Sequence, residues 1–463
     1  MNYELCINDS VKDFIKKHLN DDVNKLALSK FPEEIDKQFV IRQIQAQQIL
    51  KKKLPSWAEN DELIFPKKLS LEQCSSELTA KYKAQLSTKL HETSRKISAD
   101  SCDLVDEEIS TKLHETSRKI SSDSCDLVDE ERILVDLTGG MGVDTAFLSD
   151  NFDNTYYVEM QEELCDIARH NFRILNKNIE VVNDNAEHFL TICGEVDCIY
   201  LDPARRDEYG RKMVSLHDCS PDVAELQDVL FEKAKTIMVK LSPMLDIDIV
   251  KKELKNIKEI HIIAVKNECK EILVLLSQQT LPMAHGSQLI ATDLRENWNF
   301  SFTEDEEQNA EWTLADKVGK YLYEPGVAFM KAGCFKLLSQ KYNLDKLHRN
   351  SHLYTSDELV PDFPGRIFEV INVVPFDKKA KKSLWETQRR KDAKMQSVED
   401  SATLRLCDSA TLKKANIAVR NFPLSAEELK KNLGLQDGSE FYIFGTTMKG
   451  EKKIVVLAKK VHF

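Results

Sequence analysis

The stretch Ile133 to Thr145, with the sequence ILVDLTGGMGVDT, constrains the fold of this chain more than any other. An apolar run ends in an acid, Asp136, and passes directly into a turn that contains Gly139, Gly140 and Gly142. The residues that follow have the pattern of a helix. A buried parallel strand, a tight loop and a helix open the doubly wound α/β fold. Glycine lets the loop turn sharply and lets a ligand lie against bare backbone at the helix N-terminus.

The glycine loop does not fit a dinucleotide-binding motif, because G-x-G-x-x-G counted from Gly140 would need a third glycine at Thr145. Three further predicted strands are each followed by an acid: residues 155–158 by Glu159, 179–182 by Asp184, and 198–201 by Asp202. A single acid in such a place often only caps the next helix. Four acids in register instead favour one shared ligand, because open α/β sheets bind ligands at the carboxyl ends of their strands.

The glycine loop and the acid series resemble a class I S-adenosylmethionine (SAM) methyltransferase. The resemblance implies that Asp136 and the loop hold the methionine end of SAM, that Glu159 holds the ribose and that Asp184 meets the adenine. The cofactor contacts expected in full are Asp136, Thr138, Gly139, Gly140, Gly142, Asp144, Glu159, Asp184, Asn185 and Asp202. The implied fold is α/β, with a Rossmann-like seven-stranded sheet, an N-terminal helical domain and small C-terminal α+β domains.

The segment Asp202-Pro203-Ala204-Arg205-Arg206 indicates where methyl transfer would occur. An exocyclic base amine needs no strong base, only acceptors that orient its N–H groups and hold the nitrogen against the methyl group. The amino-methyltransferases use [D/N]-P-P-[aromatic] here, so the resemblance assigns this role to the Asp202 carboxylate and the Pro203 carbonyl. Ala204 and Arg205 depart from that pattern, although an arginine plane can also stack on a base. The alternative is an Asp-Pro that only turns the chain out of the strand.

Four cations, Arg205, Arg206, Arg211 and Lys212, lie beside this position in the sequence. SAM carries no phosphate, so the cofactor does not explain them, whereas a phosphodiester substrate would. Salt bridges to neighbouring acids explain them equally well. The residues expected to carry catalysis are Asp202, Pro203, Arg205 and Arg206.

The composition indicates an ordinary globular protein that is too long for a single core, with 463 residues of which 42% are hydrophobic and 31% charged. Its net charge of −12 is uneven, because residues 331–463 carry 25 Lys+Arg and 16 Asp+Glu, or +9, which leaves −21 for the rest. A basic C-terminal part suggests contact with a polyanion, and a solvated lysine-rich surface is the alternative.

The cysteines and the apolar runs indicate in which cellular compartment the protein is found. Eleven scattered cysteines without a C-x-x-C pair indicate reduced thiols and no structural metal. The N-terminus lacks a signal pattern, and no apolar run reaches the ~18–20 residues of a membrane span. We therefore expect a cytoplasmic protein that contacts no membrane.

Further motifs narrow the resemblance to one bacterial group. They are Asp202-Pro-Ala-Arg-Arg206, Gly210-Arg-Lys212, Leu241-Ser-Pro243, Lys270-Glu-Ile-Leu273 and Tyr321-Leu-Tyr-Glu-Pro325. The combination resembles the class I SAM methyltransferases that carry a ferredoxin-like insert and a C-terminal THUMP-like domain. THUMP domains dock RNA in other enzymes, which implies methylation of a base in tRNA or rRNA, with an exocyclic amine favoured. The alternatives are a non-catalytic RNA-binding or assembly protein, and a methyltransferase that acts on a protein or a small molecule.

Five segments are expected along the chain. They are an N-terminal helical domain (1–86), a duplicated polar linker (87–132), the SAM-binding domain (133–280), a linker or lid with a small ferredoxin-like unit (281–366), and a basic THUMP-like domain (367–463). The linker is a near-perfect repeat, in which Ser87–Ile109 recurs as Ser110–Arg132 with two differences. Two copies are too few for a solenoid, which needs about three to bury a continuous core.

Overall fold

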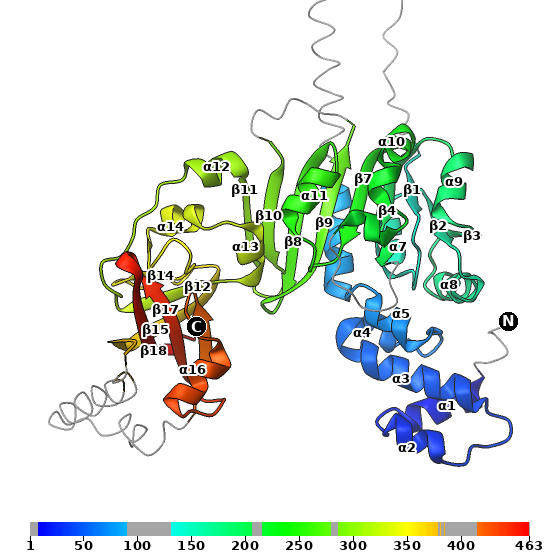
Figure 1. Ribbon diagram of the computed structural model, residues 1–463. Helices are drawn as coiled ribbons and strands as arrows, with labels where there is room; N and C mark the ends of the chain where they lie inside the picture. Colours follow the sequence, from blue (N-terminus) through cyan, green and yellow to red (C-terminus); the bar gives the residue numbers. More distant parts are fainter. Residues whose placement is uncertain are drawn as a thin grey trace, which may run out of the picture. The chain divides into compact units, whose positions relative to one another are not determined.

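The computed structural model describes residues 8–89, 131–205, 215–278, 286–377, 380, 384 and 414–462 (Figure 1). Most of the duplicated linker, and the side chains of Arg205, Arg206, Arg211 and Lys212, lie outside the described residues. The chain divides into two compact units. The first is Met1–Lys258 with Leu273–Leu281, and the second is Glu259–Ile272 with Pro282–Phe463.

The N-terminal part of the first unit is helical (Figure 1). Its helices are α1 (Asp9–His18), α2 (Val23–Leu28), α3 (Lys37–Lys53), α4 (Pro55–Ala58), α5 (Lys68–Gln73) and a helix over residues 77–89. The side chains of Asn8, Asp22 and Asp36 accept hydrogen bonds from backbone N–H groups in the first turns of α1, α2 and α3, respectively. These caps fix where each helix begins.

The same helices share a core with the sheet that follows them. Leu50, Trp57 and Phe65 belong to one buried cluster with Tyr157 and Phe172. The Asn171 amide also joins the two parts, because it accepts from the Ile64 N–H at 2.9 Å and donates to the Ile64 carbonyl at 2.8 Å. The N-terminal helices are thus built onto the sheet domain.

A nine-stranded sheet has the order β11-β10-β8-β9-β7-β4-β1-β2-β3. Its strands are β1 (Ile133–Asp136), β2 (Asn154–Glu159), β3 (Glu180–Asn183), β4 (Val196–Leu201), β7 (Ala234–Leu241), β8 (Ile257–Val265), β9 (Glu268–Ser277), β10 (Gln288–Asp293) and β11 (Trp298–Thr303). The neighbouring strands from β3 to β7 are all parallel. The intervening helices are α7 (Val143–Leu148), α8 (Glu162–Ile174), α9 (Ala186–Ile192), α10 (Val223–Lys233) and α11 (Ile247–Glu253). The expected α/β class and Rossmann-like sheet are confirmed.

Residues 288–303 differ from the expectation of a linker or lid. They form β10 and β11, of which β10 runs parallel to β8 and pairs antiparallel with β11. The acidic residues Glu304 to Glu307 give this stretch the composition of a linker, but they lie in the next helix, α12 (Glu304–Asn309), where the Thr303 and Glu306 side chains form a capping box. Acids in the first turn of a helix are favourable, so this acidity marks a helix start.

The second unit contains a seven-stranded sheet with the order β13-β14-β12-β15-β18-β17-β16. Its strands are β12 (Tyr321–Pro325), β13 (Asp345–Lys346), β14 (Tyr354–Ser356), β15 (Gly365–Pro375), β16 (Asn416–Arg420), β17 (Phe441–Met448) and β18 (Lys452–Lys460). The helices α13 (Val327–Ala332), α14 (Lys336–Tyr342) and α16 (Ala426–Leu433) accompany them. The two segments expected as separate C-terminal units therefore share one sheet.

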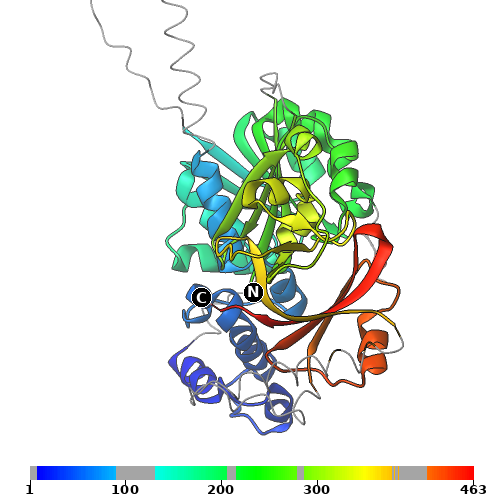
Figure 2. The same cartoon turned by 90° about the vertical axis from the view of Figure 1, so that its left-hand side faces the viewer.

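The last two strands of the chain form a hairpin. β17 and β18 pair antiparallel around a turn in which Gly450 has φ +75°. The helix α16, orange beside the red strands in Figure 2, places Leu429 and Leu433 in one core with Val455 and Leu457 of β18. No helix within the described residues is long and apolar enough to span a membrane.

Candidate active site

The sheet brings the predicted acids to one edge. Because β3, β2, β1 and β4 are parallel neighbours, the residues at or just after their carboxyl ends share one side of the sheet. Asp136 and Glu159 end β1 and β2, whereas Asp184 and Asp202 follow β3 and β4.

The glycine loop between β1 and α7 is fixed by packing at two positions and open at a third. A Cβ on Gly139 would lie 2.3 Å from the Tyr157 ring, and one on Gly142 would lie 2.7 Å from the Phe172 ring. Gly140 has φ +55°, and the nearest atom to an added Cβ there is the Thr138 carbonyl oxygen at 3.7 Å. Tyr157 also donates its hydroxyl to the Gly140 carbonyl at 2.6 Å. Aromatic rings therefore pack directly against the loop at Gly139 and Gly142, whereas a Cβ at Gly140 would meet only an ordinary van der Waals contact.

Glu159 is buried and is held in place by two backbone donors. Its Oε2 accepts from the Gly140 N–H at 2.9 Å, and its Oε1 accepts from the Gln161 N–H at 2.9 Å. Each carboxylate oxygen can accept a further hydrogen bond. Its geometry suits the expected contact with two ribose hydroxyls.

Asp136 is 1% exposed and accepts hydrogen bonds from the Thr138 N–H at 2.9 Å and the Thr145 hydroxyl at 2.5 Å. Burial raises the pKa of Asp136 from its ordinary 3.8 to about 7. The two hydrogen bonds oppose that shift, and the negative charges of Asp144 and Asp202 add to it. A buried carboxylate with this pKa is stabilised in its charged form by a cation, which the ammonium group of a methionine would supply.

Asp144, expected among the cofactor contacts, bonds to side chains of the protein. It accepts from the Ser75 hydroxyl at 2.6 Å and from the Tyr200 hydroxyl at 2.7 Å. The Lys83 ammonium lies 3.1 Å away and that of Lys240 lies 4.0 Å away. Burial acts to raise the pKa of Asp144, but the two lysines and the two hydroxyls outweigh it and hold the pKa below its ordinary range.

Asp202 pairs with a lysine from the neighbouring strand. Its carboxylate accepts from the Lys240 ammonium, and its backbone N–H donates to the Thr138 hydroxyl at 2.6 Å. The predicted Thr138 therefore links the glycine loop to Asp202. The side chain of Asp202 is 36% exposed, so it remains accessible to a substrate.

The segment after Asp202-Pro203 forms a short ribbon. β5 (Ala204–Arg205) pairs antiparallel with β6 (Cys219–Ser220). Proline has no N–H for such a ladder, so alanine at 204 suits the ribbon better than the second proline of the amino-methyltransferase pattern. The expected roles of the Arg205 side chain and of Arg206 fall outside the described residues.

Asp184 and Asn185 lie at the start of α9. Asp184 pairs with His188 at 2.6 Å, and this hydrogen bond lowers the pKa of Asp184. The Asn185 side chain accepts from the His188 N–H at 2.8 Å and caps the helix. Both residues thus contribute to the helix start, which is the role we considered as the alternative to adenine binding.

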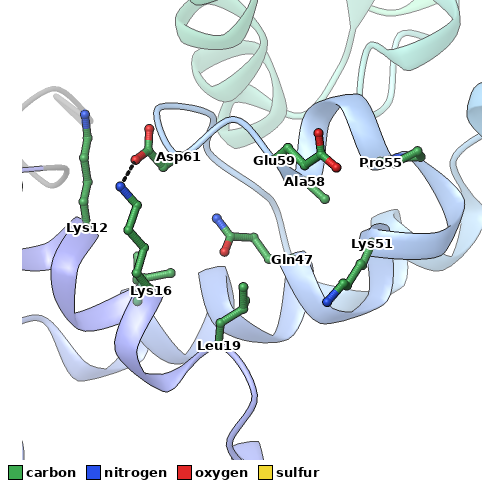
Figure 3. A pocket seen from close by; sticks show the side chains of 10 residues that line it. Lys12, Lys16, Leu19, Gln47, Lys51, Pro55, Ala58, Glu59 and Asp61 are labelled. Atoms are coloured by element: carbon green, nitrogen blue, oxygen red, sulfur yellow. Dashed lines mark ion pairs between the residues drawn. The ribbon is translucent and has the colours of Figure 1, made fainter.

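Two other features involve none of these residues. His217, Asp222 and Glu225 are the one group among the described residues whose ligand atoms could surround a metal ion, but His217 already bonds to Asp222 at 2.8 Å and Asp222 caps α10. A cavity of about 280 Å³ lies among α1, α3 and α4, with the ion pair of Lys16 and Asp61 at its side (Figure 3). No predicted site residue lines it.

Sequence reasoning included neither Lys83 nor Lys240 among the site residues. The sequence pattern does place Lys240 near the end of β7, at the same edge of the sheet as the acids, but it gives Lys240 no role there. Lys83 shares a buried stripe with Thr79, Ala80 and Leu86, at the spacing of one helix face. A lysine on such a stripe needs a charged partner, and only the fold shows that the partner is Asp144.

Comparisons with known proteins agree with this architecture. The profile of a family described as a ferredoxin-like domain matches residues 321–364, and that of a family described as THUMP domain-like matches residues 398–460. A crystal structure described as a candidate methyltransferase from Porphyromonas gingivalis W83 is 30% identical, with a TM-score of 0.74. The match covers 100% of this chain and 99% of that one.

The sheet and the glycine loop are those of the class I methyltransferase fold, and the ferredoxin-like and THUMP-like domains follow it in the chain. This chain belongs to the bacterial family of the P. gingivalis protein, with that fold and with ferredoxin-like and THUMP-like domains.

More distant solved structures match part of the chain only. An rRNA methylase from Streptococcus thermophilus is 19% identical over 32% of this chain and 88% of its own, with a TM-score of 0.25. A candidate methyltransferase from Streptococcus mutans in complex with S-adenosylhomocysteine (SAH) is 16% identical over 32% of this chain and 89% of its own, with a TM-score of 0.25. Among proteins of curated function, none matches this chain.

Proposed function

We propose that this protein is a SAM-dependent methyltransferase that acts on a base in tRNA or rRNA. The observation that carries the proposal is the buried Asp136 beside a glycine loop that no side chain crowds at Gly140, with Glu159 on the next strand. SAM would supply an electrophilic methyl group. Asp136 would pair with its ammonium, Glu159 would accept from the ribose hydroxyls, and Asp184 with Asn185 would meet the adenine.

The acceptor would be an exocyclic amine positioned at Asp202 and Pro203. Asp202 is accessible and its backbone is anchored to the glycine loop through Thr138, so its carboxylate is held in a fixed place. A fixed acceptor aligns the nitrogen lone pair with the methyl group without removing a proton beforehand. Arg205 and Arg206 would hold the flanking phosphates.

The second unit would dock the RNA. Support comes from the match to a THUMP-like domain and from the excess of positive charge in residues 331–463. A methyltransferase that acts on a protein or a small molecule would leave this basic part without a role. An RNA-binding protein without turnover would have no need for Asp136, whose burial with its charge is unfavourable.

The test is incubation of the protein with methyl-labelled SAM and total RNA from a strain that lacks the gene, followed by mass spectrometry of the nucleosides. We expect one methylated nucleoside to gain label, and Asp202→Ala to lose that activity while SAH binding by calorimetry is kept. Asp228→Ala, on the exposed face of α10, is the matched control. If the protein bound NAD instead of SAM, the proposed function would be wrong. If Asp202→Ala kept full activity, the role of Asp202 in positioning the amine would be wrong.

A further inference from the structure

Four charged side chains of alternating sign form a row from the N-terminal helices to Asp202. Lys83, on the helix over residues 77–89, lies 3.1 Å from Asp144 of α7. Lys240 of β7 lies 4.0 Å from the other Asp144 oxygen and bonds directly to Asp202. The order is therefore lysine, aspartate, lysine, aspartate, with Asp144 between the two cations.

Because Lys83, Asp144 and Lys240 are buried, the position of each charge depends on the others. The Lys83 side chain is 0% exposed and that of Lys240 is 11% exposed, so water screens neither. Ser75 reinforces the first link, because its hydroxyl accepts from Lys83 at 3.0 Å and donates to Asp144 at 2.6 Å. Asp144 is thus compensated mainly by Lys83, which leaves Lys240 available to Asp202.

We propose that Lys83 is a positioning residue, which balances the negative charge of Asp144 and so keeps Lys240 on Asp202. Without Lys83, the nearest cation to the buried Asp144 among the described residues would be Lys240. A lysine side chain has four rotatable bonds and can close a gap of this size. Lys240 would move to Asp144, and the Asp202 carboxylate would lose the partner that orients it. The N-terminal helices would then be part of the active site, although they contribute no group that touches the substrate.

The role given to Asp202 rests on the proposed function, but the position of Lys240 does not. The first test is therefore a crystal structure of Lys83→Met, with Lys81→Met as control. Lys81 lies on the same helix, is exposed and pairs with Glu77 at 2.6 Å. We expect the Lys240 ammonium to leave Asp202 and approach Asp144 in Lys83→Met only. If Lys240 stays on Asp202, the proposal is wrong, whatever the substrate proves to be.

The second test is kinetic. Lys83→Met should lower kcat by roughly tenfold per folded molecule and leave the KM for SAM nearly unchanged, because alignment at the reacting atom is lost and cofactor binding is not. Adding Asp144→Asn removes the charge that attracts Lys240, so the double variant should recover kcat to within about threefold of the wild type. A structural role alone would change the folded fraction and not kcat per folded molecule.

A milder variant keeps the test decisive if Lys83→Met does not fold. Ser75→Ala weakens the link between Lys83 and Asp144 without removing a charge, so it should lower kcat in the same direction by about twofold to threefold. Unchanged kcat in Ser75→Ala, with Lys240 still on Asp202 in its crystal structure, would overturn the proposal. Absence of any methyl transfer by the wild type would instead refute the proposed function.

Discussion

Asp144 and Glu324 are buried carboxylates that each lie between two cations, one in each unit of the chain. The cations of Asp144 are sealed from water, as the Lys83 side chain is 0% exposed and that of Lys240 11% exposed. Those of Glu324 are Arg366 of β15 and Arg420 of β16, whose side chains are 31% and 37% exposed. The first arrangement acts inside the protein, whereas the second presents charge to the solvent.

The choice of cation fits this difference. A lysine ammonium is a compact charge that fits a closed network of hydroxyls and carboxylates. An arginine guanidinium has five donors, so it can hold Glu324 with one edge and still offer others to a phosphate. Arg366 also lies over the rings of Phe368 and Tyr442, with its central carbon 5.6 and 5.7 Å from their centroids. Glu324 thus orients Arg366 and Arg420 on the seven-stranded sheet.

The largest expected effect is the loss of stability in Asp144→Ala. The substitution leaves Lys83 buried without its charge partner, which should lower the free energy of unfolding by roughly 3–5 kcal/mol. Asp144→Asn with Lys83→Met removes both charges and should recover most of that loss. Denaturant unfolding monitored by circular dichroism measures both variants. A loss below about 1 kcal/mol in Asp144→Ala would show that the site is not sealed.

The second prediction concerns pH and Asp136. The pKa of Asp136 is raised from 3.8 to about 7 in the folded protein, so between those values the folded state keeps a proton that the unfolded chain has lost. Stability without ligand should therefore fall as the pH rises from about 4 to 7, by up to about 4 kcal/mol. Asp136→Asn should remove this dependence and make the ligand-free protein more stable at pH 8, as thermal melts at several pH values would show.

SAM binding should respond to the same group in the opposite direction. A proton on Asp136 must leave before the carboxylate can pair with the ligand's ammonium, so affinity should rise up to tenfold per unit between pH 5.5 and 7. Calorimetry across that range tests this, below the pH of about 8 at which an α-amino group loses its own proton. An affinity that is flat in pH would contradict the role of Asp136 at the methionine end.

The sequence was sufficient for the parts of this site that depend on local pattern. The end of β1, the glycine loop and the acids at four strand ends follow from periodicity and turn chemistry, which operate over a few residues. The sequence does not predict β10 and β11, because the acids of α12 follow them directly and give the stretch the composition of a linker. The link from Lys83 to Asp144 joins residues 61 positions apart, and a contact at that separation depends on tertiary packing.

The next prediction compares the two acids directly. Glu324→Gln should lower the free energy of unfolding by about 1–2 kcal/mol, less than Asp144→Ala, because half-exposed arginines can turn to water when their acid is neutralised. Matched denaturant curves for the two variants give the difference. Equal losses would mean that Arg366 and Arg420 depend on their acid as strongly as Lys83 does.

The smallest expected effect is on RNA binding, and it decides what the exposed arginines do. If they contact phosphates, Arg366→Ala and Arg420→Ala should each reduce the slope of log affinity against log salt by about one unit and leave SAH binding unchanged.

Lys459→Ala is the matched control. Lys459 pairs with Glu440 at 2.7 Å, and because Lys460 lies opposite Phe368, the alternation of side chains along β18 puts Lys459 on the other face of the sheet from Phe368 and Arg366. Filter binding of the RNA at several salt concentrations measures the three slopes. Equal slopes in the arginine variants and the control would show that Arg366 and Arg420 only stabilise the fold. Glu324 and Asp144 would then differ in the burial of their cations and not in function.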